Sequence, residues 1–209
     1  MTPLEQLMTT DSFDGETFAG FDAHAIDLSH KEFEGCTFRN MKLSESRWMG
    51  AVLEDCTFEG CDLSGAVPRG MVTRDVRFNE CKLLGVDWTG LGTAPRVAFE
   101  SCDLRYAIFS KIDLTNTAFF RSNITEASFV EVDLSESDFD GSDLTGTTFT
   151  SCVLRKADFT RALGVLIDPA KNRVKDVRVS IESAVLLAAS FDMRVGGFQQ
   201  NDVRPRRRR

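Results

Sequence analysis

Large apolar residues recur at every fifth position along most of this chain. The most regular of them are phenylalanines at Phe18, Phe38, Phe58 and Phe78 and, after one extra residue, at Phe99, Phe119, Phe139 and Phe159. Between two such phenylalanines the interval of five continues, as in Ile124, Phe129 and Leu134. A spacing of five matches neither the 3.6-residue period of a helix nor the two-residue period of a strand. The pattern therefore predicts a repeat architecture.

The two periods together predict the shape of the repeat. A five-residue unit that always turns one large residue inward forms one side of a coil, and recurrence at twenty gives four sides per coil. Equivalent sides then stack about 4.8 Å apart, as neighbouring strands do. The inward residues of stacked sides form four columns along the solenoid. One column consists of Phe, one mostly of Leu (Leu104, Leu144), one includes Trp48 and Trp88, and the fourth ends in Leu154. We expect a four-sided solenoid with a solid core.

A second inward position lies two residues before each large one and holds mostly small side chains. All six cysteines occupy it, at Cys36, Cys56, Cys61, Cys81, Cys102 and Cys152. Free cysteine packs as a small buried hydrophobe, and no C-x₂-C spacing suggests zinc. We expect free inward thiols, no metal and no cofactor. With only His24 and His30 available as histidine bases, we also expect no enzymatic activity.

The pattern divides the chain into four segments. We expect a lead-in over 1–10, the solenoid over 11–163, a cap and dimerisation segment over 164–195, and a disordered basic tail over 196–209. Within the cap, Ser180 can begin a helix over 181–189, and Phe191 to Val195 alternates like a strand.

Two irregular stretches interrupt the repeat. The first stretch preserves the spacing of five, so it predicts one loosely packed side of a coil. The second stretch contains one inserted residue, which a corner of the coil could tolerate without any functional role. Their candidate loop residues are Pro68, Arg69, Gly70 and Met71 in the first, and Gly90, Leu91, Gly92, Thr93, Ala94, Pro95 and Arg96 in the second.

Charge is distributed unevenly. The net charge of −7 combines −12 over residues 1–163 with +5 over residues 164–209. A run without any Lys or Arg, residues 122–154, holds Glu126, Glu131, Asp133, Glu136, Asp138, Asp140 and Asp143. Such a surface could attract a basic DNA-binding site, although acidity at the repeat's own Asp positions and simple solubility are competing explanations. No secretory signal or membrane span is visible, so we expect a cytoplasmic protein.

The units Cys61-Asp62-Leu63, Ser142-Asp143-Leu144 and Ala157-Asp158-Phe159 fit the A(D/N)Lxx repeat. The chain thus resembles the pentapeptide-repeat family over about residues 33–163. The resemblance implies an all-β fold, a right-handed quadrilateral β-helix, with a short C-terminal helix and strand.

The C-terminal stretch from Ile167 to Val195 narrows this resemblance to the topoisomerase-protecting branch, as does the stretch 76–88. That branch comprises quinolone-resistance proteins and immunity proteins against albicidin and microcin. The resemblance implies an acidic homodimeric rod that binds DNA gyrase, and possibly topoisomerase IV, as a mimic of duplex DNA, with no direct contact to nucleic acid or membrane. The expected dimer residues are Val185, Leu186, Leu187, Phe191 and Met193. The competing hypothesis is an interaction scaffold with another protein partner, and the sequence does not identify the poison that is countered.

Overall fold

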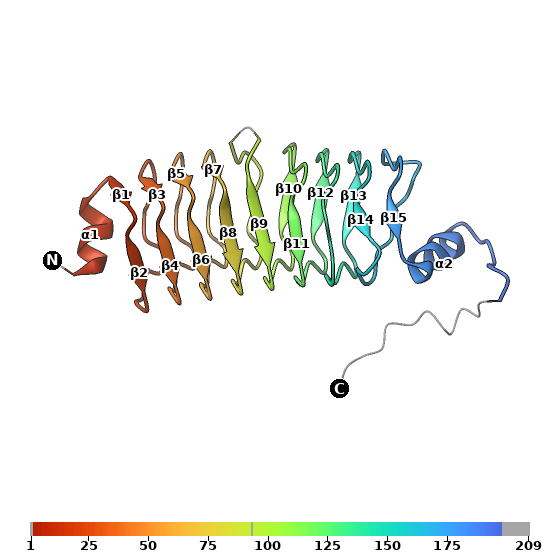
Figure 1. Ribbon diagram of the computed structural model, residues 1–209, viewed down its shortest axis with the longest axis horizontal. Helices are drawn as coiled ribbons and strands as arrows, with labels where there is room; N and C mark the ends of the chain where they lie inside the picture. Colours follow the sequence, from red (N-terminus) through yellow and green to blue (C-terminus); the bar gives the residue numbers. More distant parts are fainter. Residues whose placement is uncertain (1, 93, 198–209) are drawn as a thin grey trace.

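The computed structural model describes residues 2–92 and 94–197, and it forms a straight rod with one helix at each end (Figure 1). The elements in chain order are α1 (Pro3–Thr9), β1 (Ser12–Asp14), β2 (Thr17–Ala19), β3 (Glu32–Glu34), β4 (Thr37–Arg39), β5 (Val52–Glu54), β6 (Thr57–Glu59), β7 (Val72–Arg74), β8 (Val76–Asn79), β9 (Val97–Glu100), β10 (Ile108–Ser110), β11 (Ala118–Phe120), β12 (Ser128–Val130), β13 (Thr148–Thr150), β14 (Asp158–Phe159), β15 (Arg178–Val179) and α2 (Ile181–Ser190).

Four long sides run along the rod, and every strand pair on them is parallel. The phenylalanine side carries the sheet β11-β9-β8-β6-β4-β2, with Phe18 beside Phe38 and Phe38 beside Phe58. The tryptophan side carries β10-β12-β13, and the fourth side carries β1-β3-β5-β7. On the leucine side the coils are joined by isolated bridges such as Asp143 with Leu163. The expected right-handed quadrilateral β-helix is confirmed.

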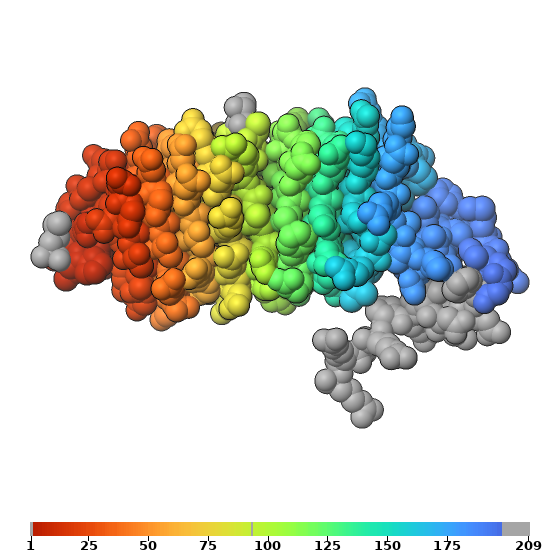
Figure 2. All heavy atoms as spheres, viewed as in Figure 1, coloured from red at the N-terminus to blue at the C-terminus, as the bar shows by residue number. Residues whose placement is uncertain are grey.

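The core is a set of stacked rings. Phe119 and Phe139 lie 4.8 Å apart with their planes at 3°, whereas Phe109 and Phe119, on neighbouring sides, meet edge to face at 90°. Both arrangements are favourable for aromatic quadrupoles. All eight phenylalanines spaced by twenty are buried, so the inward register is as expected. The space-filling view shows the coils stacked side by side along the rod (Figure 2).

The small inward position also supplies hydrogen-bond donors. Ser142 Oγ donates to the carbonyl oxygen of Phe119 at 2.6 Å, and Cys152 Sγ approaches that of Phe129 at 3.3 Å. All six cysteines are buried there, which confirms their inward position. A buried carbonyl benefits from such a partner, so these side chains fill space and satisfy backbone groups together.

Each five-residue unit turns at a corner residue, two after the large one, which adopts left-handed backbone geometry, as at Glu126 with φ 58°. Most corners tolerate a side chain. Gly164 also has positive φ, at 66°, but it stands at the position of a large residue, and a Cβ there would lie 2.6 Å from Thr145 Cα.

The two ends of the rod differ from the sequence-based expectations. Residues Pro3–Thr9 form helix α1 rather than a plain lead-in, and its Leu7 is fully buried over the first coil. At the other end the coil continues past residue 163, because Val153 bridges Arg173 and Phe159 pairs with Val179. Gly164 and Pro169 occupy positions where large residues would have shown the repeat.

Helix α2 begins after its N-cap Ser180, close to the expected position. The strand expected over Phe191 to Val195 is absent: Phe191 is the C-cap of α2, and turn and irregular backbone follow. Residues 191–195 therefore pair with no strand among the described residues. Of the tail expected to be disordered over 196–209, residues 198–209 lie outside the described part of the chain.

Candidate functional site

The outward positions of the coils carry the charge, and oppositely charged residues pair from one coil to the next. Arg39 bonds to Glu59 at 2.7 Å, Arg74 to Glu54 at 3.0 Å, and Lys156 to Glu136 at 2.7 Å. Partners about twenty residues apart lie side by side on adjacent coils. Such exposed pairs contribute only about 0–1 kcal/mol each to stability, but they neutralise much of the surface.

The seven acids of the run 122–154 are spread around all four sides of the rod. The run winds around the axis more than once, so it forms a girdle rather than a stripe. Glu126 and Asp143 lie on the leucine side, Glu131 on the tryptophan side, Asp133 and Glu136 on the fourth side, and Asp138 and Asp140 on the phenylalanine side. The structure therefore does not bring them together on one face.

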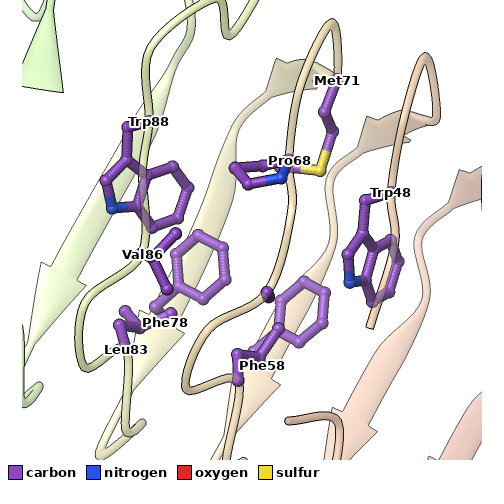
Figure 3. A pocket seen from close by; sticks show the side chains of 10 residues that line it. Trp48, Phe58, Pro68, Met71, Phe78, Leu83, Val86 and Trp88 are labelled. Atoms are coloured by element: carbon purple, nitrogen blue, oxygen red, sulfur yellow. The ribbon is translucent and has the colours of Figure 1, made fainter. Parts of the chain in front are cut away.

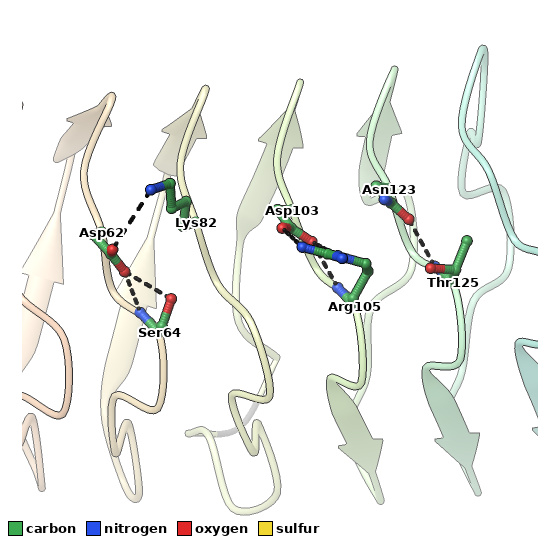
Figure 4. Close-up of polar contacts among 7 residues, drawn as sticks. All are labelled: Asp62, Ser64, Lys82, Asp103, Arg105, Asn123 and Thr125. Atoms are coloured by element: carbon green, nitrogen blue, oxygen red, sulfur yellow. Dashed lines mark hydrogen bonds and ion pairs between the residues drawn. The ribbon is translucent and has the colours of Figure 1, made fainter. Parts of the chain in front are cut away.

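Three of these acids have a role in the backbone. Asp133, Asp138 and Asp143 each accept a hydrogen bond at Oδ1 from the backbone N–H two residues later, at 2.9–3.0 Å. Figure 4 shows the same turn at Asp62, Asp103 and Asn123. Because Asn123 makes the turn without a charge, the repeat requires the side-chain oxygen and not the negative charge.

Of the other four acids of the girdle, two form ion pairs with a cation and two do not, among the described residues. Glu126 and Glu131 have no ion-pair partner among the described residues. Lys156 Nζ holds Glu136, and this hydrogen bond lowers the pKa of Glu136 below its usual value. Asp140 is paired with Arg161. About half of the charge outside the repeat's own Asp positions is thus compensated.

A stronger acidic surface lies on the fourth side at the N-terminal end. Asp14 stands directly beside Glu34, and Glu34 directly beside Glu54, in the register of β1, β3 and β5. Like charges opposite each other on a sheet are destabilising. Among the described residues only Glu54 has a cation, Arg74. We call Asp14, Glu34 and Glu54 the carboxylate ladder; Glu32 and Asp55 flank it. The acids of the ladder were not among the expected site residues, although their spacing of twenty was visible in the sequence.

The first irregular stretch does not form a loop. Pro68 and Met71 are buried at ordinary inward positions, and Val67 bridges Arg47 in the regular way. Pro68 replaces an aromatic ring between Trp48 and Trp88 and leaves an apolar cavity of about 10 Å³ (Figure 3). Proline is accommodated in this turn of the coil. The loop expected at Pro68, Arg69, Gly70 and Met71 is therefore absent, and the stretch is a regular part of the coil with a packing defect in the core, which we call the core defect.

The second irregular stretch does leave the coil. Gly92 N and Arg96 N still bond to the carbonyls of Met71 and Thr73, at 2.8 and 3.1 Å, so the extra residue is absorbed between them. The described residues on either side of the insertion lie on the fourth side, between β8 and β9 in Figure 1. Leu91 and Pro95 are buried, Ala94 is exposed, and Thr93 lies outside the described residues. Arg96 pairs with Asp75 at 3.1 Å.

The expected dimer residues fall into two groups. Val185 is buried against its own chain, and Leu186 and Leu187 are half-buried, so they act first as the cap. Phe191 and Met193 are exposed, at 48% and 57%, and so is Ile181 at 64%. Ile181 was not anticipated.

Within the described residues there is no cluster of three or more His, Cys, Asp or Glu side chains suited to a metal ion. The helices of this part of the chain are too short or too polar to cross a bilayer.

Comparisons with known proteins agree with this architecture. A profile described as pentapeptide repeats (8 copies) matches residues 32–67, and one described as a pentapeptide repeat region matches residues 93–163. Both leave out 68–92, which contains the core defect. The search of curated proteins gave no significant match.

Two solved structures of trypsin-treated QnrB1, a plasmid-mediated fluoroquinolone resistance protein, share the fold. One has a TM-score of 0.64 and 24% identity and covers 88% of this chain and 89% of its own. The other has a TM-score of 0.63 and 22% identity and covers 89% and 97%. Together with the two profiles, which span about half of the residues, the coil geometry shows that this chain belongs to the pentapeptide-repeat family.

Proposed function

We propose that this protein binds DNA gyrase as a mimic of duplex DNA and protects it from a poison that traps the cleaved complex. The observation that carries the proposal is the carboxylate ladder. Its like charges lie side by side on a flat sheet, and Asp14 and Glu34 lack a cation among the described residues. A basic DNA-binding surface would relieve this repulsion, as it does for phosphates.

The dimensions of the rod support the proposal. From Phe18 to Val179 the phenylalanine side advances by eight coils, roughly 38 Å at 4.8 Å per coil. This corresponds to roughly 11 base pairs at 3.4 Å each, and a tail-to-tail dimer would double it. QnrB1, which shares this fold, is a fluoroquinolone resistance protein. The resemblance of residues 167–195 to the topoisomerase-protecting branch favours gyrase as the partner, with topoisomerase IV as a second target to assay.

The dimer itself is part of the proposal. Ile181, Phe191 and Met193 expose apolar surface at the C-terminal end, and burying it against a second copy is favourable. Sedimentation at micromolar concentration should show a dimer that Phe191→Glu with Met193→Glu converts to a monomer. Met49→Glu, at an exposed residue far from this end, is the control. A monomeric wild-type protein would reject the dimer.

Gyrase supercoiling assays with several cleavage-complex poisons test the function. Wild-type protein should restore supercoiling, and the ladder variant Asp14→Asn/Glu34→Gln should require at least about tenfold more protein, since binding of opposite surfaces depends on charge. A second variant, Glu126→Gln/Glu131→Gln, measures separately how much the two unpaired acids of the girdle contribute to the restoration of supercoiling. The matched control is Glu45→Gln/Glu80→Gln, which removes two exposed acids from other sides.

Salt provides the second arm of this experiment. Exposed charges are screened beyond about 8–10 Å at physiological ionic strength, so gyrase binding should weaken as salt rises. Binding that persists both in high salt and in the ladder and girdle variants would exclude mimicry of DNA.

The projecting stretch at Gly90–Arg96 is proposed to act in protection more than in binding, because only a feature that leaves the rod can reach a bound drug. Shortening it by one residue, to restore the spacing of twenty, should preserve gyrase binding and reduce rescue. If no poison is countered while another protein is retained on the immobilised rod, the chain is an interaction scaffold instead.

A further inference from the structure

Three exposed cations gather on the fourth side at the C-terminal end of the rod. Arg155 lies directly beside Lys175, because Lys156 N bonds to the Lys175 carbonyl at 3.0 Å, and Arg173 bridges Val153 on the same two coils. We call Arg155, Arg173 and Lys175 the cation patch. None of the three has an ion-pair partner among the residues that the structure describes.

The patch departs from the pairing that holds elsewhere on the rod. Most other cations face an acid about twenty residues away, whereas the residue one coil before Lys175 is Arg155, and the one before Arg155 is Ser135. Like charges in adjacent strands repel. On this side of the neighbouring coils the acids are Asp133, which holds a backbone turn, Glu136, which is paired with Lys156, and Asp176. Glu136 also feels the charge of Arg155, but its ion pair is with Lys156, so most of the positive charge of the patch is left unpaired among the described residues.

We propose that the cation patch binds the phosphate backbone of duplex nucleic acid. This goes beyond the proposed function and departs from the expectation that the protein makes no contact with nucleic acid. Neighbouring coils place Arg155 and Lys175 about 4.8 Å apart, and Arg173 and Lys175, two residues apart along the chain, lie roughly 6.6 Å apart. Two guanidinium groups can bind phosphate oxygens bidentately.

The charge distribution of the chain supports this occupant. Residues 164–209 carry a net +5, and the sequence after Gly197 contains five arginines, at Arg204 and Arg206 to Arg209. The rod thus has an acidic body and a basic C-terminal part. A nucleic acid held at this part would lie close to the end that carries α2.

A second copy of the chain fits the patch less well. The carboxylate ladder has the opposite sign and lies on the same side, so antiparallel rods could in principle pair both surfaces. The insertion between Gly92 and Arg96, with Ala94 exposed, lies on that side between the two surfaces, and it would interrupt the contact of two such faces.

Fluorescence anisotropy with a labelled duplex of about 20 base pairs, titrated at several salt concentrations, tests the inference on the full chain without gyrase. The patch variant is Arg155→Gln/Arg173→Gln/Lys175→Gln. The control Arg69→Gln/Arg77→Gln/Lys111→Gln removes three exposed, unpaired cations of the same types from other sides. A third variant replaces the five terminal arginines with Gln. Equal melting temperatures would show that all variants fold.

The expected result is specific to the patch. The logarithm of the association constant decreases linearly with the logarithm of the salt concentration, and this slope should become less steep by about 0.9 for each lost phosphate contact. The patch variant should therefore show a slope that is less steep by nearly 3. Its binding in low salt should be at least about tenfold weaker. The control should match wild type. Equal binding by patch variant and control, or loss only when the terminal arginines are replaced, would overturn the proposal. So would low-salt self-association that both the patch and the ladder variants abolish, which would identify a second copy as the occupant.

Discussion

At the scale of single residues, an inward side chain in this rod has to meet two requirements, volume and hydrogen bonding. Trp48 meets both, since its Nε1 donates to Ser46 Oγ at 2.7 Å. Trp88 occupies the equivalent place two coils later, but Val86 stands where Ser46 would be, and Trp88 Nε1 is buried without a partner among the described residues. A buried unsatisfied N–H costs about 1–3 kcal/mol.

This contrast gives a prediction with its own internal control. Ser46→Val should lower the free energy of unfolding by about 1–3 kcal/mol because it orphans a buried donor. Val86→Ser should cost clearly less, because the new hydrogen bond to Trp88 offsets the lost apolar burial. Urea denaturation of both variants measures the difference. Equal losses would contradict the account of Trp88.

The phenylalanine stack can be tested at two consecutive residues. Phe119 is fully buried and Phe120 points outward and is half-buried. Phe119→Ala should cost about 3–5 kcal/mol, the usual range for a buried aromatic side chain, and Phe120→Ala much less. Chemical denaturation would show the inward register to be wrong if the two losses were similar.

The buried thiols predict a pH dependence. Burial raises the pKa of Cys152, so the folded state keeps this thiol neutral, and its contribution to stability is complete below the unfolded-state pKa of about 8.5 and is lost as pH rises. Between pH 7.5 and 9.5 one such thiol accounts for at most about 1.4 kcal/mol. Cys152→Ala, under reducing conditions, should lose less stability over this range than wild type. An identical loss would argue against a neutral buried thiol.

At the scale of elements, the last coil is held by side-chain hydrogen bonds more than by large inward residues. Asn172 Nδ2 donates to the carbonyls of Phe149 and Asp168, each at 3.0 Å, and its Oδ1 accepts from Cys152 N, also at 3.0 Å. One buried amide thus joins the coil of residues 164–179 to the coil beneath it. Helix α2 follows this coil directly, and its Val185 is buried.

Asn172→Ala should therefore loosen the C-terminal end selectively. Because it leaves buried backbone groups unsatisfied, hydrogen exchange should become faster over residues 164–190, while coils near the middle keep their protection. Asn79→Ala, at an outward position of β8 with ordinary strand geometry, should change neither region. Uniformly faster exchange along the rod would contradict a local role.

At the scale of the whole molecule, a solenoid must cover its two open ends. Helix α1 does so at the N-terminus, with Leu7 fully buried and Met8 exposed at 63%. An uncovered coil would present unpaired strand edges to other chains.

Leu7→Asp should consequently promote association through the N-terminal end, whereas Met8→Asp should not, since it adds the same charge at an exposed position. Light scattering coupled to size-exclusion chromatography would detect larger species in the first variant only. If both variants behave like wild type, α1 is not required as a cap.

The sequence by itself determined the repeat, the four sides and the identity of the inward residues between Phe33 and Phe159, because a period of twenty fixes the register of every parallel pair. Tertiary structure decided what a period does not encode. The coil beyond Gly164 exists through backbone pairing and Asn172, and the alternation from Phe191 to Val195 finds no strand to pair with. The charged surface was decided in the same way: contacts between coils pair Glu136 and Asp140 with cations. Within the described residues they leave Asp14, Glu34, Arg155 and Lys175 without an ion pair, because residues twenty apart become neighbours only when the chain is wound.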